Sequence, residues 1–138
     1  MRVVGIDPGL KTTGYGIVEG SGSSFSLVEA GVCSTRERDE MPVRVRCIYD
    51  DVLAVLEELK PEGAAIEQLY AHYAHPRTAI LMGHARGAIM LAAAKYGIPV
   101  ASYSATMIKK SLTGNGHAGK GQVQRMIEVM LGLSRPPE

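Results

Sequence analysis

The chain has 138 residues, of which 46% are hydrophobic and 21% charged, and its formal net charge is +1. This length predicts one domain over residues 1–138, which folds without disulfides or a structural metal. No apolar run approaches the ~20 residues of a membrane span, and the opening MRVVGIDPGL holds no secretory hydrophobic stretch. We therefore expect a cytoplasmic protein without a membrane partner. The two cysteines, Cys33 and Cys47, lack C-x-x-C spacing and are expected to be buried thiols.

Three strands are predicted at the start of the chain. Residues 2–7 form a short apolar run that ends at Asp-Pro-Gly, which is typical of a buried strand entering a turn. Residues 13–19 predict a second strand, which a Gly-Ser-Gly-Ser turn closes, and residues 25–35 predict a third. Because the connections are short, we expect an antiparallel meander.

The hydrophobic period then changes from that of strands to that of helices. Apolar residues at helical spacing predict an amphipathic helix that begins near Pro42 and ends at Pro61. Residues 63–67 (GAAIE) predict a short buried strand. Residues 76–96 predict a helix that Pro76 opens, and its many alanines and glycines imply close packing against a neighbouring element.

The last part of the chain completes the predicted fold. Residues 98–103 predict a fifth strand, and residues 107–112 a short helix. A glycine-rich loop over residues 114–121 and a final helix over residues 123–133 follow. The order β-β-β-α-β-α-β-α predicts an α/β fold, in which helices flank a mixed five-stranded sheet.

The small net charge conceals a strong asymmetry along the chain. Residues 1–74 carry seven Lys and Arg against twelve Asp and Glu, a balance of −5. Residues 75–138 carry eight against two, a balance of +6, and no acidic residue stands between Glu67 and Glu128. A half this basic favours a polyanionic partner such as nucleic acid. The alternative is that the basic half pairs with the acidic half of the same chain.

Two carboxylates stand at the ends of predicted strands. Asp7 ends the first apolar run, and Glu67 ends the GAAIE strand. If the two strands are parallel neighbours, both carboxylates emerge at the sheet edge where α/β proteins place their ligands. The two carboxylates repel each other unless a cation lies between them, and their hard oxygen ligands suit Mg²⁺ or Mn²⁺. The alternative for Asp7 is a plain turn opener before Pro-Gly, whereas Glu67 lies close to the core and needs a partner or a metal.

The glycine-rich loop invites a second interpretation as a nucleotide site. Its sequence GNGHAGKG follows the phosphate-binding P-loop pattern up to the last position, where Gly121 replaces the required Ser or Thr. The loop also follows a predicted helix, whereas the P-loop follows a strand. We therefore do not expect nucleotide binding here. The backbone amides of the glycines and the Lys120 ammonium are expected to bind a DNA phosphate instead.

The residues also carry a family likeness. The opening GIDPGLKTTGYGIV, the segments AIEQLY and MGHARG, and NGHAGKGQVQRMI resemble, in this order, motifs of the RuvC family of Holliday-junction resolvases, crossover junction endodeoxyribonucleases. The resemblance implies an RNase-H-like fold and a homodimeric nuclease of recombination and repair. Such an enzyme cuts two opposing strands of a four-way DNA junction symmetrically with two divalent metal ions per active site. The resemblance also suggests a branch-migration helicase complex as a partner.

The motifs assign roles to the two carboxylates. Asp7 in GIDPG and Glu67 in AIEQ match two of the family's four catalytic, metal-binding carboxylates. Family members continue past the equivalent of Pro137 with an Asp-rich segment that supplies the other two, whereas this sequence ends at Glu138. The resemblance therefore implies that this 138-residue form lacks the last helix and half of the metal ligands. A form that binds junctions without cutting them is the alternative that follows.

The remaining candidates are DNA-binding residues. Tyr70 matches an aromatic position that stacks on, or wedges into, the junction bases, where stacking is worth ~1–3 kcal/mol per base. Its alternative is an aromatic side chain that packs under a loop. Lys109 and Lys120 match basic positions that hold phosphates beside the scissile bond. Arg77 and Lys110 are further candidates from their charge and neighbourhood.

The sequence leaves two alternative functions open and also predicts an oligomeric state. Within the same fold, a nuclease of the RuvX/YqgF type is the alternative. A nucleotide-binding enzyme of the sugar-kinase and actin type shares an Asp-x-Gly turn, but such enzymes need two domains of this size. The small residues 83–87, with Met82 and Met90, predict a two-fold dimer interface, unless this helix face packs on its own sheet.

Overall fold

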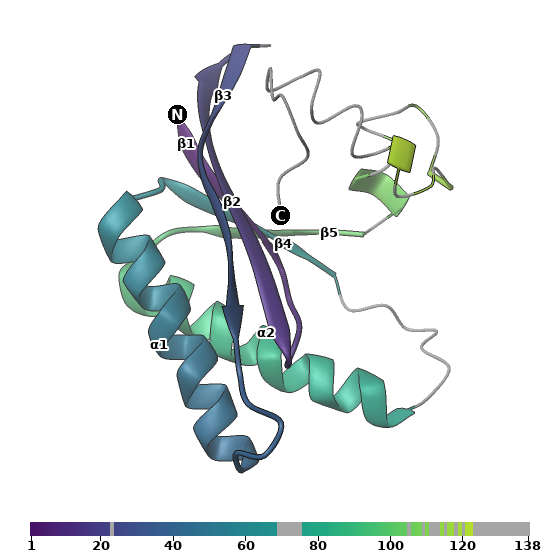
Figure 1. Cartoon of the computed structure of the whole chain (residues 1–138). Coiled ribbons are helices and arrows are strands. Elements are labelled where there is room, and N and C mark those ends of the chain that lie inside the picture. Colours follow the sequence, from purple (N-terminus) through teal and green to yellow (C-terminus); the bar gives the residue numbers. More distant parts are fainter. Residues whose placement is uncertain are drawn as a thin grey trace.

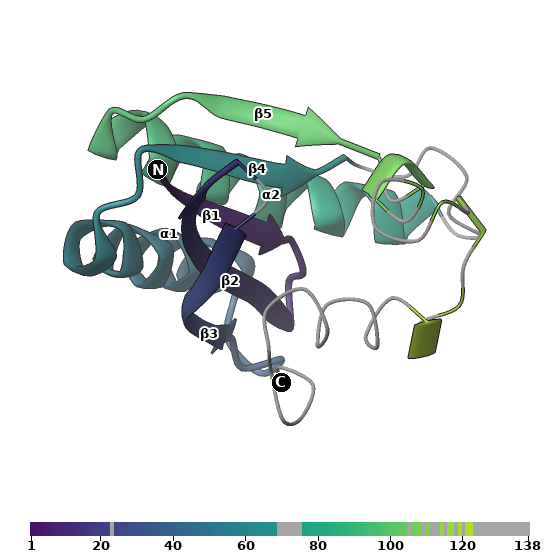
Figure 2. The same cartoon turned by 90° about the horizontal axis from the view of Figure 1, so that it is seen from above.

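The computed structural model describes residues 1–22, 24–68, 76–104, 106–108, 110, 114, 116–117, 119 and 121–122. These residues form one five-stranded mixed sheet with two long helices (Figure 1). The sheet order is β3-β2-β1-β4-β5, and Figure 2 shows the strands following one another in this order. The bounds are β1 Arg2–Asp7, β2 Thr12–Ser21, β3 Ser24–Ser34, α1 Met41–Leu59, β4 Gly63–Glu67, α2 Pro76–Tyr96 and β5 Val100–Tyr103.

The first three strands form the expected antiparallel meander. β1 pairs with β2 and β2 with β3, so that Ile6 lies opposite Tyr15, and Tyr15 opposite Gly31. A Cβ atom on Gly31 would come within 2.7 Å of the Tyr15 hydroxyl oxygen, so this glycine makes room for the phenol. β1 and β4 are parallel neighbours, as are β4 and β5, because α1 and α2 provide the crossovers.

Both helices contribute to a single core on one face of the sheet. Side chains alternate between the faces of a strand, and the buried set includes Val4, Ile6, Ile17 and Ile66. α1 adds Ile48, Val52 and Leu56, whereas α2 adds mainly alanines. The alanines let α2 approach α1 closely, as the composition of this helix predicted.

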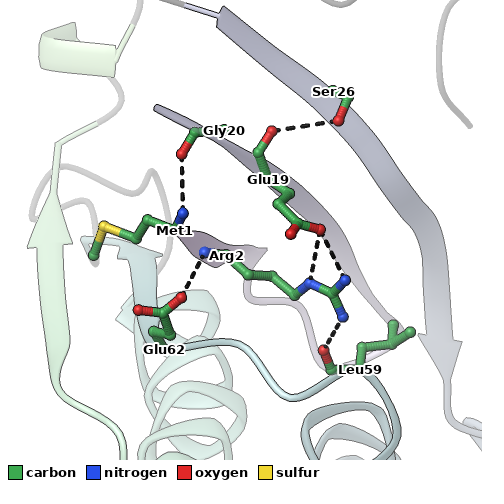
Figure 3. A network of polar contacts seen from close by, with 7 residues as sticks. All are labelled: Met1, Arg2, Glu19, Gly20, Ser26, Leu59 and Glu62. Carbon is green, nitrogen blue, oxygen red and sulfur yellow. Dashed lines mark hydrogen bonds and ion pairs between the residues drawn. The ribbon is translucent and has the colours of Figure 1, made fainter. Parts of the chain in front are cut away.

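The amino-terminal edge of the sheet is tied by the side chain of Arg2 (Figure 3). Its guanidinium pairs with Glu19 at 2.8 Å and donates to the Leu59 carbonyl at 2.6 Å. The hydrogen bond from Arg2 and the charge of this group lower the pKa of Glu19. The backbone amide of Arg2 donates to the Glu62 carboxylate at 3.2 Å. Arg2 thereby joins four segments at the end of the sheet opposite Asp7, which are β1, β2, the end of α1 and the start of β4.

Element boundaries differ from the prediction mainly at β5. We predicted a strand from residue 98, whereas β5 begins at Val100. Gly97, with a φ of 91°, lets the chain leave α2, and the amides of Gly97 and Ile98 both still donate to the Ala93 carbonyl. The amide of residue 98 is therefore used by the cap that follows α2, and the strand begins only after it. Residues 106–108 and 110 are helical, whereas the predicted helix over 123–133 lies outside the described residues.

Tyr15 provides a test of this packing through the pH dependence of stability. Its hydroxyl donates to Glu29 at 2.9 Å, and burial, followed by this hydrogen bond and the Glu29 charge, raises the pKa of Tyr15 to about 12. The contribution to stability is complete below pH ~10 and is lost as the pH rises through the folded-state pKa. We expect the free energy of unfolding to fall between pH 10 and 12, and less steeply in Tyr15→Phe. Urea unfolding over this pH range measures the free energy of unfolding. Tyr103→Phe, which removes the hydroxyl of an exposed tyrosine, is the control. An equal fall in Tyr15→Phe and the parent would contradict the assignment.

Candidate functional site

The two candidate carboxylates end neighbouring parallel strands. Asp7 is the last residue of β1 and Glu67 the last of β4, and the register aligns Ile6 with Ile66 directly before them. Strands this close lie ~4.8 Å apart. Because Ile6 and Ile66 point into the core, Asp7 and Glu67 point to the opposite face. The strand geometry therefore brings the two predicted residues together, with Asp7 exposed and Glu67 half-buried.

A tight turn holds the chain directly after Asp7. The Thr13 hydroxyl donates to the Gly9 carbonyl at 2.7 Å and accepts from the Gly9 amide at 3.3 Å, and Thr13 is fully buried. A Cβ atom on Gly9 would collide with the Thr12 carbonyl oxygen. The turn is also anchored outward, because the Leu10 carbonyl accepts from the Thr35 hydroxyl at 2.6 Å. The position of Asp7 thus depends on a glycine and a buried threonine.

The sheet face beside Asp7 is built from glycines. Gly14 pairs with Asp7, and Gly5 pairs with Gly16 next to them. A Cβ atom on Gly14 would lie 4.0 Å from the Asp7 Cβ, and one on Gly16 would meet nothing within 4 Å. No side chain of β2 opposite Asp7 and Gly5 therefore covers this part of the sheet, and a large ligand can approach the carboxylate.

β5 adds a residue that sequence reasoning missed. Tyr103 pairs with Glu67 in the parallel register and is 42% exposed, on the same face as both carboxylates. Tyr103 was predicted only as the end of a strand, because its neighbour is known only once the order of β4 and β5 is known. An aromatic ring beside two carboxylates can contact a base or a sugar.

The predicted DNA-binding residues are described only in part. Arg77 lies exposed in the first turn of α2, and Lys110 is exposed in a helical stretch after β5. Tyr70, Lys109 and Lys120 lie outside the described residues. A Cβ atom on Gly116 would lie 2.7 Å from the Thr106 methyl group, so Gly116 packs closely against Thr106.

The chemistry of the site is that of hard oxygen ligands. In the described part of the chain, no group of three or more His, Cys, Asp and Glu side chains is placed to hold a metal ion. Asp7 and Glu67 form a pair, and Glu67 also has a further interaction of its own. Two carboxylates on adjacent strand ends fit a divalent cation such as Mg²⁺ or Mn²⁺, whereas soft ligands are absent from these positions.

The two cysteines differ in burial. Cys33 is buried, as expected, and burial raises the pKa of its thiol to about 11. Cys47 was also expected to be buried but is only half-buried, because it lies beside the buried stripe of α1 formed by Ile48, Val52 and Leu56. Its thiol lies 3.6 Å from the Asp51 carboxylate. Among the described residues, no helix is both long and apolar enough to cross a membrane.

The fold and the carboxylate pair define the class of protein. A five-stranded mixed sheet in the order β3-β2-β1-β4-β5, covered by helices, is RNase-H-like. The yeast mitochondrial Holliday junction resolvase shares this fold, with a TM-score of 0.67 at 15% identity over 93% of this chain and 61% of its own.

Relatives with higher sequence identity narrow the class to one family. The family described as crossover junction endodeoxyribonuclease RuvC matches residues 3–138. The Rhodopirellula baltica protein of that name is 48% identical over 136 residues, which cover 99% of this chain and 76% of the relative. The structure of T. thermophilus RuvC in complex with a Holliday junction substrate has a TM-score of 0.94 at 36% identity. That match covers 100% of this chain and 84% of the other. The chain belongs to the RuvC family, which confirms the likeness that its motifs carry.

Proposed function

We propose that this chain is a structure-specific endonuclease that resolves four-way DNA junctions in recombination and repair. It hydrolyses phosphodiesters in two opposing strands with the help of divalent metal ions. The observation that carries the proposal is the pair Asp7 and Glu67 on adjacent parallel strand ends, in a chain of the RuvC family. The likeness to T. thermophilus RuvC in complex with its junction substrate supports the choice of DNA substrate.

Asp7 and Glu67 would hold the metal ions, which are Mg²⁺ or Mn²⁺ and two per active site. When bound, such ions provide an activated hydroxide and stabilise the leaving oxygen. The protein's own part is positional: the Gly9–Thr13 turn fixes Asp7, and the ladder between β1 and β4 keeps Glu67 beside it. The glycine face of β1 and β2 leaves room for the DNA backbone to reach both groups.

The basic half of the chain would bind the DNA. Residues 75–138 carry the balance of +6, whereas the ion pairs Arg2–Glu19, Lys11–Glu37 and Arg46–Asp50 join charges within the acidic half. We assign phosphate binding to a set of exposed or motif-matched cations, and base stacking to Tyr70. The cations are Arg77, Lys109, Lys110 and Lys120.

A homodimer would match the symmetry of a junction. On α2, Ile80 is 61% exposed, Leu91 60% and Met90 41%, and a Cβ atom on Gly83 or Gly87 would meet nothing within 4 Å. Ile80, Gly87 and Leu91 recur at helical spacing, so they form an outward apolar stripe that suits a two-fold contact. Met82, which we expected in this interface, is half-buried.

Leu91→Asp should convert a dimer into a monomer in light scattering, and a monomeric parent chain would refute the dimer. A branch-migration helicase is the further partner that we propose from the family likeness.

Cleavage and binding assays decide between this function and its alternative. The 138-residue chain is incubated with a labelled four-way junction and with a linear duplex of the same sequence, with and without Mg²⁺. Paired nicks in opposing strands of the junction alone, only with Mg²⁺, support the proposal. Tight junction binding without cleavage would establish the alternative, a form that binds branched DNA and does not cut it.

Phosphate binding by the basic half predicts a defined dependence on salt. Each phosphate contact contributes to the slope of log Kd against log salt, so Arg77→Ala and Lys110→Ala should each lower the slope by about 1. Junction binding without metal, measured by fluorescence anisotropy between 50 and 200 mM salt, provides the slopes. Arg46→Ala on α1 removes an arginine from the acidic half and should leave the slope unchanged. If both Arg77→Ala and Lys110→Ala had the same slope as the parent, these two residues would not belong to the DNA-binding surface.

A further inference from the structure

The side chain of Arg86 joins helix α2 to the ends of two strands. Its Nε donates to the backbone carbonyl of Glu67 at 3.3 Å, and its Nη2 donates to the Ser102 hydroxyl at 2.6 Å. Nη1 lies 3.7 Å from the Met90 sulfur. Ser102 pairs with Ile66, whose side chain points into the core, so the guanidinium lies on the helix-covered face of the sheet. It is therefore behind the sheet, on the side opposite the Asp7 and Glu67 side chains.

The pairing of β4 explains why the Glu67 carbonyl needs this donor. The amides of Ala64 and Gln68 donate to the carbonyls of Pro99 and Tyr103, so the even-numbered residues of β4 bond to β5. The odd-numbered residues, Glu67 among them, consequently face β1. With Gly5 aligned to Ala65, the amide that would reach the Glu67 carbonyl is that of residue 8.

Residue 8 is a proline and has no amide hydrogen to give. The ladder between β1 and β4 therefore lacks its last donor at the residue whose carboxylate we assign to the metal site. Arg86 Nε donates to the Glu67 carbonyl instead.

We propose that Arg86 is a positioning residue. Its guanidinium completes the hydrogen bonding at the end of β4 and, through Ser102, clamps β4 to β5, so that Glu67 stays in register beside Asp7. This inference rests on the proposed metal-binding role of the two carboxylates. It separates Arg86 from the other cations of the basic half, since Arg86 acts through Glu67 and makes no contact with DNA.

The experiment tests whether a backbone amide at residue 8, directly after β1, can replace the Arg86 guanidinium as the hydrogen-bond donor to the Glu67 carbonyl. Arg86→Met removes the guanidinium and keeps an unbranched side chain, whereas Pro8→Ala returns an amide hydrogen to residue 8. The variants are R86M, P8A, the double variant P8A/R86M, and R86K in case R86M does not fold. Arg46→Ala, which removes an exposed arginine from α1, is the matched control.

Two quantities are measured for each variant of the full-length protein. Hydrogen–deuterium exchange of the peptide that contains β4 reports on the Gln68 amide without any requirement for activity. The Mn²⁺ concentration that gives half-maximal junction cleavage, with the junction Kd measured without metal, reports on the site. Removing a group that orients a metal ligand typically costs 10–100-fold in metal affinity or activity. We expect R86M to speed exchange at Gln68 and to raise the half-saturating Mn²⁺ concentration roughly 10-fold, with the junction Kd unchanged.

The double variant decides the mechanism. P8A/R86M should recover slow exchange and most of the parent's Mn²⁺ dependence, and P8A and R46A should each behave like the parent. Unchanged exchange and Mn²⁺ dependence in R86M, or in R86K should R86M not fold, would overturn the proposal. A loss of junction affinity alone would do the same, as would a double variant no better than R86M. If the parent itself does not cut, the proposed function fails instead, and the exchange data still test the clamp.

Discussion

Asp7→Asn should abolish junction cleavage while leaving junction binding within about two-fold of the parent. The substitution keeps the size of the side chain and removes one of the two negative charges at the ends of β1 and β4. Metal-ion stabilisation of a reacting phosphodiester is worth several kcal/mol, which corresponds to a loss of at least ~10³-fold in rate. Because Asp7 is exposed, the substitution should not disturb the core. Single-turnover cleavage of a labelled four-way junction measures the rate.

A matched substitution controls for the chemistry of the change. Asp50 is an exposed aspartate on α1 that pairs with Arg46, and Asp50→Asn should cut at the parent's rate. Glu67→Gln should behave like Asp7→Asn. Cleavage by Asp7→Asn within ten-fold of the parent would refute the assignment of Asp7 to the metal site.

Gly9→Ala should lower both the free energy of unfolding and the cleavage rate, with an effect second only to that of Asp7→Asn. A Cβ atom at this position collides with the backbone carbonyl of Thr12, which cannot move without opening the Thr13 hydrogen bonds to Gly9. Forcing atoms into an occupied space costs ~1–3 kcal/mol. We expect the free energy of unfolding to fall by about this amount, and the cleavage rate to fall because the end of β1 is displaced. Urea denaturation and single-turnover cleavage measure the two effects.

Gly16→Ala is the matched glycine control. Gly16 lies in β2 two residues from Gly14, and a Cβ atom there would meet nothing within 4 Å. This variant should unfold like the parent, and it therefore controls for the effect of a glycine-to-alanine change on stability. If Gly9→Ala were as stable as Gly16→Ala and cut as fast as the parent, the turn after Asp7 would not be what positions this carboxylate.

The sequence alone was sufficient to predict the site at the level of strands. The apolar runs before Asp7 and Glu67 indicated buried strands, and a helix between them indicated a parallel crossover. Those two inferences place the carboxylates side by side, and the pairing of β1 with β4 agrees. The assignment of Asp7 and Glu67 to catalysis remains a prediction for the experiments above.

Side-chain partners across the sheet could not be predicted in the same way. Counting charges placed Arg86 in the DNA-binding half, whereas its guanidinium bonds to the Glu67 carbonyl behind the sheet. Tyr103 lies beside Glu67 only because β5 adds to the sheet next to β4. Such relations depend on strand order and on which face a residue takes, and no local pattern of residue types encodes either.

The proposed cleavage mechanism requires Asp7 and Glu67 to hold divalent cations together. Electron paramagnetic resonance titration of Mn²⁺ tests this most directly, with the parent protein, Asp7→Asn and Glu67→Gln compared at the same concentrations. We expect the parent to bind Mn²⁺ and either substitution alone to weaken this binding by ~10-fold or more. Undiminished Mn²⁺ binding in either variant would contradict this mechanism.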